Sequence, residues 1–143
     1  MARTLLVPVD GSEHSRRALT VAATEFDADE LVVLHVVEPF DVFAVTEEAL
    51  WDEAYMEKRE QEAESLLEEY EALADDLGIT IQTAIGRGSP PREIVRAIDE
   101  YGADHVVMGS RGRTGVGRVV LGSVAETVAE RAPVSVTIVR PER

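Results

Sequence analysis

A glycine-rich segment, residues 109–123, has the residue types that bind an anion. It reads Gly-Ser-Arg-Gly-Arg-Thr-Gly-Val-Gly-Arg-Val-Val-Leu-Gly-Ser and contains five of the ten glycines, three arginines and no acid. It follows the apolar run 106–108 and precedes a helix-like run from Val124. Glycines leave backbone N–H groups uncovered, and a helix N-terminus adds further donors and a positive dipole end. The segment therefore predicts a site for a phosphate-bearing ligand.

Two well-known phosphate motifs are excluded by the order of these residues. The Walker A motif requires a lysine after its second glycine, and the segment has none. The dinucleotide fingerprint requires Gly-x-Gly-x-x-Gly, an order that Gly112, Gly115 and Gly117 do not form. What the segment does have is the spacing Gly109-x2-Gly112-x9-Gly122-Ser123.

Length and composition bound the class of protein. The chain has 143 residues, the size of one domain spanning 1–143, and 45% of them are apolar. It has no run of 18 apolar residues and no N-terminal signal pattern, so a soluble, cytoplasmic protein is expected. Without cysteine it has no disulfide and no thiolate metal site. The histidines, His14, His35 and His105, do not have the spacing of metal ligands.

The charge balance indicates which partners to exclude. There are 28 acidic residues against 14 basic ones, of which only Lys58 is a lysine, and the net charge is −14. Such a surface repels nucleic acid, and no nucleic-acid or membrane partner is expected. An acidic, lysine-poor surface is typical of a halophilic cytoplasm, where salt screens the self-repulsion. An ordinary acidic mesophilic protein is the alternative interpretation.

Strands and helices alternate along the chain to position the segment. Apolar runs predict strands at 4–9, 31–37, 79–85, 104–108 and 134–139. Helical patterns follow Ser12, cover about 46–77, begin near Ser89-Pro90-Pro91 and resume at Val124. Most of the strands are continuously apolar, as in a parallel sheet, whereas 79–85 alternates like an edge strand. The prediction is an α/β fold: one doubly wound, five-stranded parallel sheet with helices on both faces, Rossmann-like.

This architecture predicts where a ligand binds. In doubly wound sheets the ligand lies outside the carboxyl ends of the strands, where the strand order reverses. One common strand order, 2-1-3-4-5 or a relative of it, puts the first strand beside that point. The turn at Asp10 and the segment from Gly109 then lie together. The acidic helix at 46–77 has an apolar stripe and is interpreted as a cover for the sheet; a coiled-coil partner site is the alternative.

Several stretches of the chain are informative together. They are Leu-Leu-Val-Pro-Val-Asp-Gly-Ser at the start, Leu-His-Val-Val, and Ala-Asp-His-Val-Val-Met-Gly-Ser-Arg-Gly. Leu-Gly-Ser-Val-Ala-Glu-Thr-Val and Ala-Pro-Val-Ser-Val-Thr-Ile-Val-Arg-Pro follow near the end. Through these stretches the chain resembles the universal stress protein family over nearly its whole length. The Gly-x2-Gly-x9-Gly-Ser spacing marks the ATP-binding branch of that family.

The resemblance implies a role for each matching residue. Pro8, Val9 and Asp10 line the adenosine side of the pocket, with Asp10 near the ribose, and Val36 offers backbone hydrogen bonds to adenine. The residues at the ribose and phosphates are Met108, Gly109, Arg111, Gly112, Gly122, Ser123 and Val124. Asp10 and Ser123 are the candidates to share a Mg²⁺ or Mn²⁺ ion with the nucleotide.

Elementary chemistry supports part of this assignment and leaves alternatives. Side chains at Gly112 or Gly122 would fill the space of a phosphate, and Ser123 can cap the helix from Val124. The arginines of the segment, Arg111, Arg113 and Arg118, either neutralise a triphosphate or are solvated charges. Asp10 is alternatively only a cap of the first helix, a role that Ser12 can also fill.

The sequence thus predicts an ATP-binding universal stress protein that works as a nucleotide-dependent stress-response or signalling module. With no lysine or obvious base in either loop, the site is better suited to hold ATP than to cleave it quickly, and His14 and His35 are interpreted as structural. A slow ATPase or phosphotransferase and a nucleotide-free interaction protein are the alternatives. A homodimer through the last strand, Val134–Val139, is expected, unless Val134, Val136 and Ile138 simply face the core.

Overall fold

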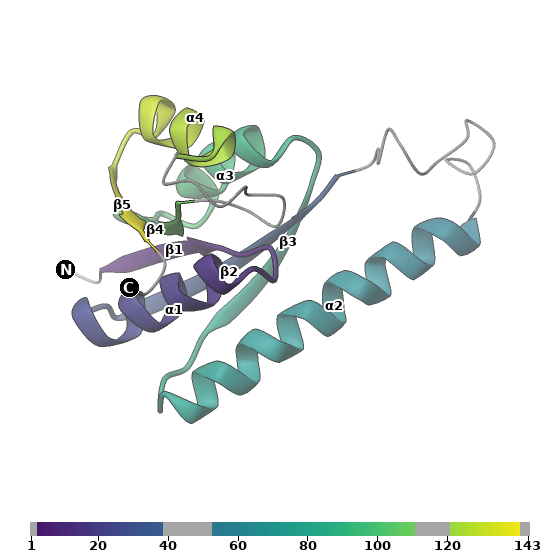
Figure 1. The fold of residues 1–143 in the computed structure, drawn as a ribbon, viewed down its shortest axis with the longest axis horizontal. Helices are drawn as coiled ribbons and strands as arrows, with labels where there is room; N and C mark the ends of the chain where they lie inside the picture. Colours follow the sequence, from purple (N-terminus) through teal and green to yellow (C-terminus); the bar gives the residue numbers. More distant parts are fainter. Residues whose placement is uncertain (1–2, 39–52, 111–120, 141–143) are drawn as a thin grey trace.

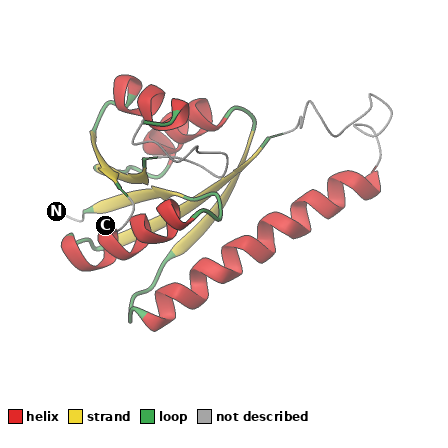
Figure 2. Ribbon diagram, in the orientation of Figure 1, coloured by secondary structure: helices red, strands yellow, loops and turns green. Residues whose placement is uncertain are grey.

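The computed structural model describes residues 3–38, 53–110 and 121–140. Strands and helices alternate, as Figures 1 and 2 show. The strands are β1 (Thr4–Pro8), β2 (Glu30–Val37), β3 (Gln82–Arg87), β4 (His105–Gly109) and β5 (Ser135–Val139). The helices are α1 (Glu13–Glu25), α2 (Glu53–Asp76), α3 (Pro90–Glu100) and α4 (Ser123–Arg131). The predicted α/β class is confirmed.

All five strands are parallel and lie in the order β3-β2-β1-β4-β5. The order is a relative of 2-1-3-4-5, with β3 and β5 at the two edges. Successive crossovers run from β1 outward to β3, and the chain then returns to add β4 on the other side of β1. The strand order therefore reverses between β1 and β4, and the predicted edge position of β3 is confirmed.

Alternate residues of the strands face two separate apolar clusters. The first cluster joins α1 and α2 to one face of the sheet, and Leu5, Val7 and Leu19 are fully buried in it. The second joins α3 and α4 to the other face around Leu6 and Val106. Figure 1 shows the two helix layers on opposite sides of the strands. Burial on both faces explains the continuous apolar runs.

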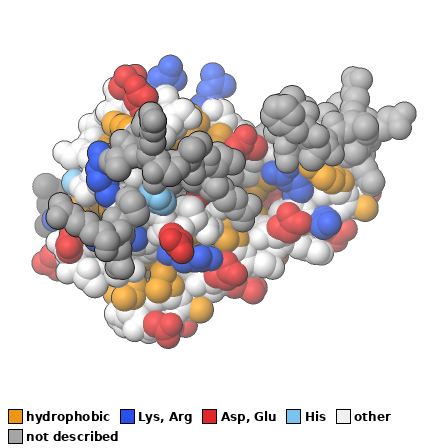
Figure 3. Space-filling model, in the orientation of Figure 1, with side chains coloured by type: hydrophobic (Ala, Val, Ile, Leu, Met, Phe, Trp, Pro, Cys, Tyr) orange, Lys and Arg blue, Asp and Glu red, His pale blue; other side chains and the backbone are white. Residues whose placement is uncertain are grey.

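Helix α2 covers the first face with one side only. Its buried residues are Ala63, Leu67, Tyr70 and Ala74. The other faces carry mostly acidic residues, and Figure 3 shows such side chains along the exposed surface of α2. The helix therefore acts as a cover for the sheet, as the apolar stripe indicated. The part of the prediction at 46–52 lies outside the described residues.

Strand β3 begins later than predicted, at Gln82 instead of Ile79. Gly78 ends α2 with a φ of 71°, and the Ile79 N–H donates back to the Ala74 carbonyl at 3.0 Å. Ile79 and Ile81 then pack against the first cluster. These two apolar side chains connect the end of α2 to the core, so the prediction that they belong to the strand is wrong.

Candidate ligand site at the carboxyl edge of the sheet

The reversal between β1 and β4 brings two distant turns together. Leu5 pairs with His105 and Leu6 with Val106, so the chain leaves both strands at the same edge. The His14 Nδ1, in the first turn of α1, lies 3.1 Å from the Oγ of Ser110, just after β4. The turn that contains Asp10 and the start of the glycine-rich segment are therefore neighbours, as predicted. In folds of this class that crevice is where ligands bind.

The turn after β1 is held by its own polar side chains. Ser12 is the N-cap of α1, and its Oγ accepts from the Ser15 N–H at 3.2 Å. The Ser12 N–H donates to the Asp10 Oδ1 at 2.9 Å, and Gly11 adopts a φ of 84°. Since Ser12 caps the helix, the alternative that Asp10 is the cap is wrong. Asp10 lies before the cap and is half-buried, just after the carboxyl end of β1.

Three predicted side chains share one face of the sheet. Met108 is part of the second cluster and Val36 packs against it. Pro8 lies two residues after Leu6 of the same cluster and therefore points to the same side. Together they place three apolar side chains on one face at the carboxyl ends of β2, β1 and β4, and we call this set the apolar floor.

Val9 points the other way, into the first cluster, where it is 5% exposed. Its N–H donates to the Leu34 carbonyl at 2.8 Å, and its carbonyl lies 2.9 Å from the His35 Nδ1. Val9 therefore joins β1 to β2 rather than adding a side chain to the floor. His35 has the structural role that was expected of it.

Strand β2 extends past its neighbour β1. The last residue pair between them is Pro8 with Leu34, whereas pairing with β3 continues to Val37 and Arg87. The Leu34 carbonyl faces β1, because it accepts from Val9. Backbone direction alternates along a strand, so the Val36 N–H and C=O point to the same side, beyond the end of β1. Val36 thus presents one donor and one acceptor to the crevice.

Gly109 is required by the packing of α1. A Cβ at this position would lie 2.7 Å from the His14 Cβ and 2.9 Å from the His14 carbonyl carbon. Gly109 therefore has a structural reason that does not involve a ligand, namely the close approach of α1 to β4.

Ser110, which is 3% exposed, links the end of β4 to two further elements. Its N–H donates to the Val139 carbonyl at 2.9 Å, and its carbonyl accepts from the Gly122 N–H at 2.7 Å. The two ends of the glycine-rich segment are thereby joined directly. Its middle, with Arg111, Gly112, Arg113 and Arg118, lies outside the described residues.

Helix α4 begins one residue earlier than expected, and the predicted Ser123 cap is wrong. Gly122 is the N-cap, with extended backbone at φ −64° and ψ 154°, and no side chain caps the helix. Ser123 already belongs to the first turn, from which its side chain cannot act as the cap. The N–H groups at the start of a helix need a partner from outside it. Ser123 is exposed and Val124 half-buried, so this end suits an anion.

Two hydroxyl groups at the site were missed by the sequence reasoning. The Tyr70 Oη lies 2.5 Å from the Ser15 Oγ and accepts from the Gly11 N–H at 3.1 Å. Burial removes water from the Tyr70 hydroxyl and raises its pKa, so the group stays protonated at neutral pH. The tyrosine in the apolar stripe of α2 was the available signal in the sequence, because a buried tyrosine needs a partner for its hydroxyl. The sequence could not say that this partner is the turn after β1.

No preformed metal centre is found within 3–38, 53–110 and 121–140, where no three histidine or acidic side chains group together. Over the same ranges, no helix has the length and hydropathy of a membrane span. Asp10 and Ser123 remain single oxygen donors at the ends of different elements.

The strand order defines a doubly wound α/β protein in which the order reverses between β1 and β4, the place where ligands bind in folds of this class. Within that class, the chain belongs to the universal stress protein family, whose profile matches residues 1–140. It is 35% identical over 141 residues to a universal stress protein of Methanocaldococcus jannaschii, covering 96% of this chain and 82% of that protein.

Solved structures of the family have the same fold. The universal stress protein UspA from Lactobacillus plantarum superposes with a TM-score of 0.80 at 27% identity, over 96% of this chain and 97% of that one. A universal stress protein crystallised in complex with cAMP superposes with a TM-score of 0.69 at 27% identity, over 97% of both chains. A relative of this fold therefore binds an adenine nucleotide.

Proposed function

We propose that the crevice between β1 and β4 binds an adenine nucleotide, ATP foremost, and that the protein is a nucleotide-dependent stress-response or signalling module. The proposal rests on one observation: two complementary sets of backbone groups, at the start of α4 and at Val36, lie at the carboxyl edge of the sheet. The start of α4 has backbone donors without a side-chain cap. Across the crevice, the strand edge at Val36 offers the donor and acceptor that a base requires.

The arrangement also favours one direction for the nucleotide. Phosphates prefer the N-terminus of α4, where N–H groups and the helix dipole attract negative charge. The Asp10 carboxylate repels phosphate and suits the ribose hydroxyls, to which it is an acceptor. The base then lies over the apolar floor of Pro8, Val36 and Met108, within reach of the Val36 backbone. The relative that is bound to cAMP supports this class of ligand.

The crevice holds a nucleotide better than it cleaves one. Asp10 and Ser123 supply one carboxylate and one hydroxyl, which suit a Mg²⁺ or Mn²⁺ ion that arrives with the nucleotide. Such an ion would neutralise phosphate charge. Slow hydrolysis is the accompanying candidate activity. If ATP hydrolysis persists in both Asp10→Ala and Ser123→Ala, these two residues have no part in that hydrolysis.

The free edge of β5 is the proposed dimer interface. The side chains of Val134, Val136 and Ile138 are half-buried against the second cluster, so they face the core and need no partner. The groups that a partner strand would bind at this edge are backbone N–H and C=O groups. Val139 turns its carbonyl toward Ser110, so by alternation Val136 and Ile138 point their N–H and C=O groups outward. A second copy of the strand would satisfy them.

Mass spectrometry of the purified protein, native and then denatured, tests the ligand directly. The expected result is a co-purified adenine nucleotide, with calorimetry giving tighter binding of ATP than of GTP. Gly122→Val is expected to weaken ATP binding about 10- to 100-fold by blocking charge-assisted hydrogen bonds. Ala129→Val, on the exposed side of the same helix, is the matched control. Unchanged affinity in Gly122→Val, or a protein that binds no nucleotide, would leave the nucleotide-free interaction protein as the better interpretation.

A further inference from the structure

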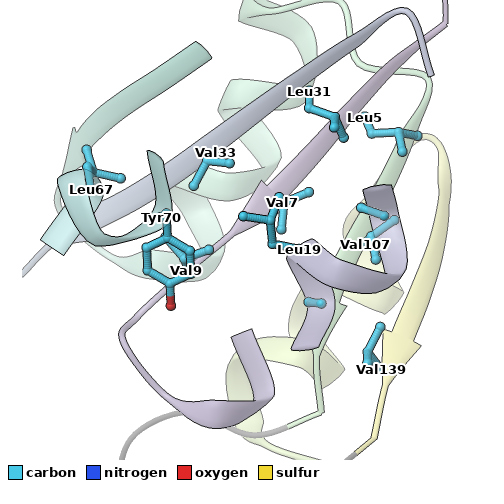
Figure 4. Close-up of a cluster of buried hydrophobic side chains, with 12 residues drawn as sticks. Leu5, Val7, Val9, Leu19, Leu31, Val33, Leu67, Tyr70, Val107 and Val139 are labelled. Carbon is cyan, nitrogen blue, oxygen red and sulfur yellow. The ribbon is translucent and has the colours of Figure 1, made fainter. Parts of the chain in front are cut away.

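Tyr70 joins α2 to the turn after β1. Its ring is 1% exposed and packs in the first cluster with Val9, Val33 and Leu67, as Figure 4 shows. The ring alone would explain an apolar residue at this position, but a phenylalanine would fill the same space. The hydroxyl needs a separate reason, because a buried polar group is costly unless it is paired.

The direction of each hydrogen bond around this hydroxyl follows from the other bonds that its partners make. The Ser15 Oγ donates to the Ser12 carbonyl at 3.1 Å, so it receives the proton of Tyr70 at 2.5 Å. The Asp10 N–H also donates to the Ser15 Oγ, at 3.3 Å. Tyr70 in turn accepts from the Gly11 N–H at 3.1 Å. One hydroxyl pair thus holds the backbone of Asp10, Gly11 and Ser12 at once.

Within that turn, the backbone of Gly11 is the part with the most conformational freedom. Gly11 is in the left-handed region at a φ of 84°, and glycine has more accessible conformations than any other residue. Asp10 precedes it, and the Asp10 carboxylate takes its direction from the same turn through the Ser12 N–H. A rotation at Gly11 would therefore redirect Asp10 relative to the crevice.

We propose that Tyr70 is a positioning residue for the nucleotide site: its hydroxyl fixes the Gly11 turn and so aims Asp10 at the ligand. The proposal rests on the proposed function, because it concerns the affinity of that same crevice. It adds that a residue of α2 controls the shape of the turn after β1. The partners are 55 and 59 residues away from Tyr70 in sequence, at Ser15 and Gly11.

The test separates the hydroxyl from the ring. Tyr70→Phe keeps the packing and removes the donor to Ser15 and the acceptor for Gly11. ATP affinity is expected to fall about three- to tenfold, which corresponds to part of the free energy of the two lost hydrogen bonds. Hydrogen exchange of the Gly11 amide is expected to speed up about tenfold, which reports on the turn without any ligand. Ser15→Ala should give the same two changes, and Tyr70→Phe with Ser15→Ala should add little to either alone.

Leu66→Ala is the control for a purely structural role. Leu66 is half-buried on the same helix and packs against the same cluster, but it has no polar group. It should lower the melting temperature while Gly11 exchange and ATP affinity stay unchanged. Wild-type affinity in Tyr70→Phe, or an equal loss in Leu66→Ala, overturns the proposal. A wild-type protein that binds no adenine nucleotide refutes the proposed function instead, whatever Gly11 does, and the positioning role is then lost with it.

Discussion

Gly109→Ala tests the closest approach in the structure, that between α1 and β4. The new Cβ would lie 2.7 Å from the His14 Cβ and 2.9 Å from the His14 carbonyl carbon. Carbon atoms in contact are normally about 3.5–4.0 Å apart, so α1 must move by roughly 0.6–0.8 Å or more. Neither atom is at the end of a flexible side chain. The inner face of α1 is fixed as well, because Ala18, Leu19 and Ala22 are fully buried.

The expected cost is that of an overpacked core. Such insertions destabilise by about 1–3 kcal/mol, and the rigid surroundings of Gly109 favour the upper half of that range. For a chain of 143 residues this corresponds to a melting temperature lower by about 4–10 °C. Calorimetry without added nucleotide measures it, which keeps the effect separate from ligand binding.

Gly86→Ala is the matched control, because Gly86 also lies near the end of a strand. A Cβ there would have its nearest neighbour at 3.5 Å, an ordinary contact with Glu93. Its stability should stay within about 0.5–1 kcal/mol of wild type. A melting temperature of Gly109→Ala equal to that of wild type would refute the packing argument. An equal loss in Gly86→Ala would assign the effect to strand glycines in general.

Three further outcomes are expected. Val136→Pro should convert the proposed dimer to a monomer in light scattering, because it removes an outward N–H. Val136→Ala keeps that N–H and should remain dimeric. A dimeric Val136→Pro contradicts the β5 interface. Raising KCl from about 0.1 to 2 M should raise the melting temperature by at least about 5 °C if the charge of −14 reflects a halophilic origin, and no rise contradicts that interpretation. Burial raises the pKa of Tyr70 above 10.0, so the contribution of its neutral hydroxyl to stability is complete below pH 10. This contribution is lost as the pH rises through the folded-state pKa. Above pH 10, the melting temperature should therefore fall less steeply in Tyr70→Phe than in wild type.

The order of elements could be predicted because the central strands are buried on both faces. Thr4–Pro8 and His105–Gly109 are largely apolar runs of this kind. The expected position of a ligand, at the carboxyl edge where the strand order reverses, then follows from the class of fold. The strand order itself was not fixed in advance, since the sequence does not say on which side of β1 each crossover returns. Contacts between distant residues decide that.

Gly109 shows that a glycine proposed for a ligand site from its spacing also has a packing reason. The spacing of glycines indicated a loop that leaves room for phosphate. The structure shows a second demand, because the space over Gly109 is occupied by His14 of α1. The two residues are far apart in sequence, so composition and spacing could not reveal their contact. The same holds for Val9, which was expected at the pocket and whose side chain packs in the core.

The clearest limit of local sequence is that the same dipeptide starts two helices in two ways. Gly11-Ser12 precedes α1 and Gly122-Ser123 starts α4, yet serine is the cap in the first case and glycine in the second. The difference comes from where each glycine N–H goes. The Gly11 N–H donates to Tyr70, and the Gly122 N–H donates to the Ser110 carbonyl.

These distant partners decide what each helix end can do. Gly11 takes the left-handed conformation, which leaves Ser12 extended and free to cap α1 with its own hydroxyl. Gly122 is itself extended, so Ser123 enters the helix and no side chain covers the first N–H groups of α4. The turn after β1 thus ends in a serine-capped helix beside Asp10, whereas the start of α4 has no side-chain cap. The proposed nucleotide site uses this asymmetry, with the ribose hydroxyls at Asp10 and the phosphates at the start of α4. The asymmetry arises from two identical pairs of residues through contacts that neither pair encodes.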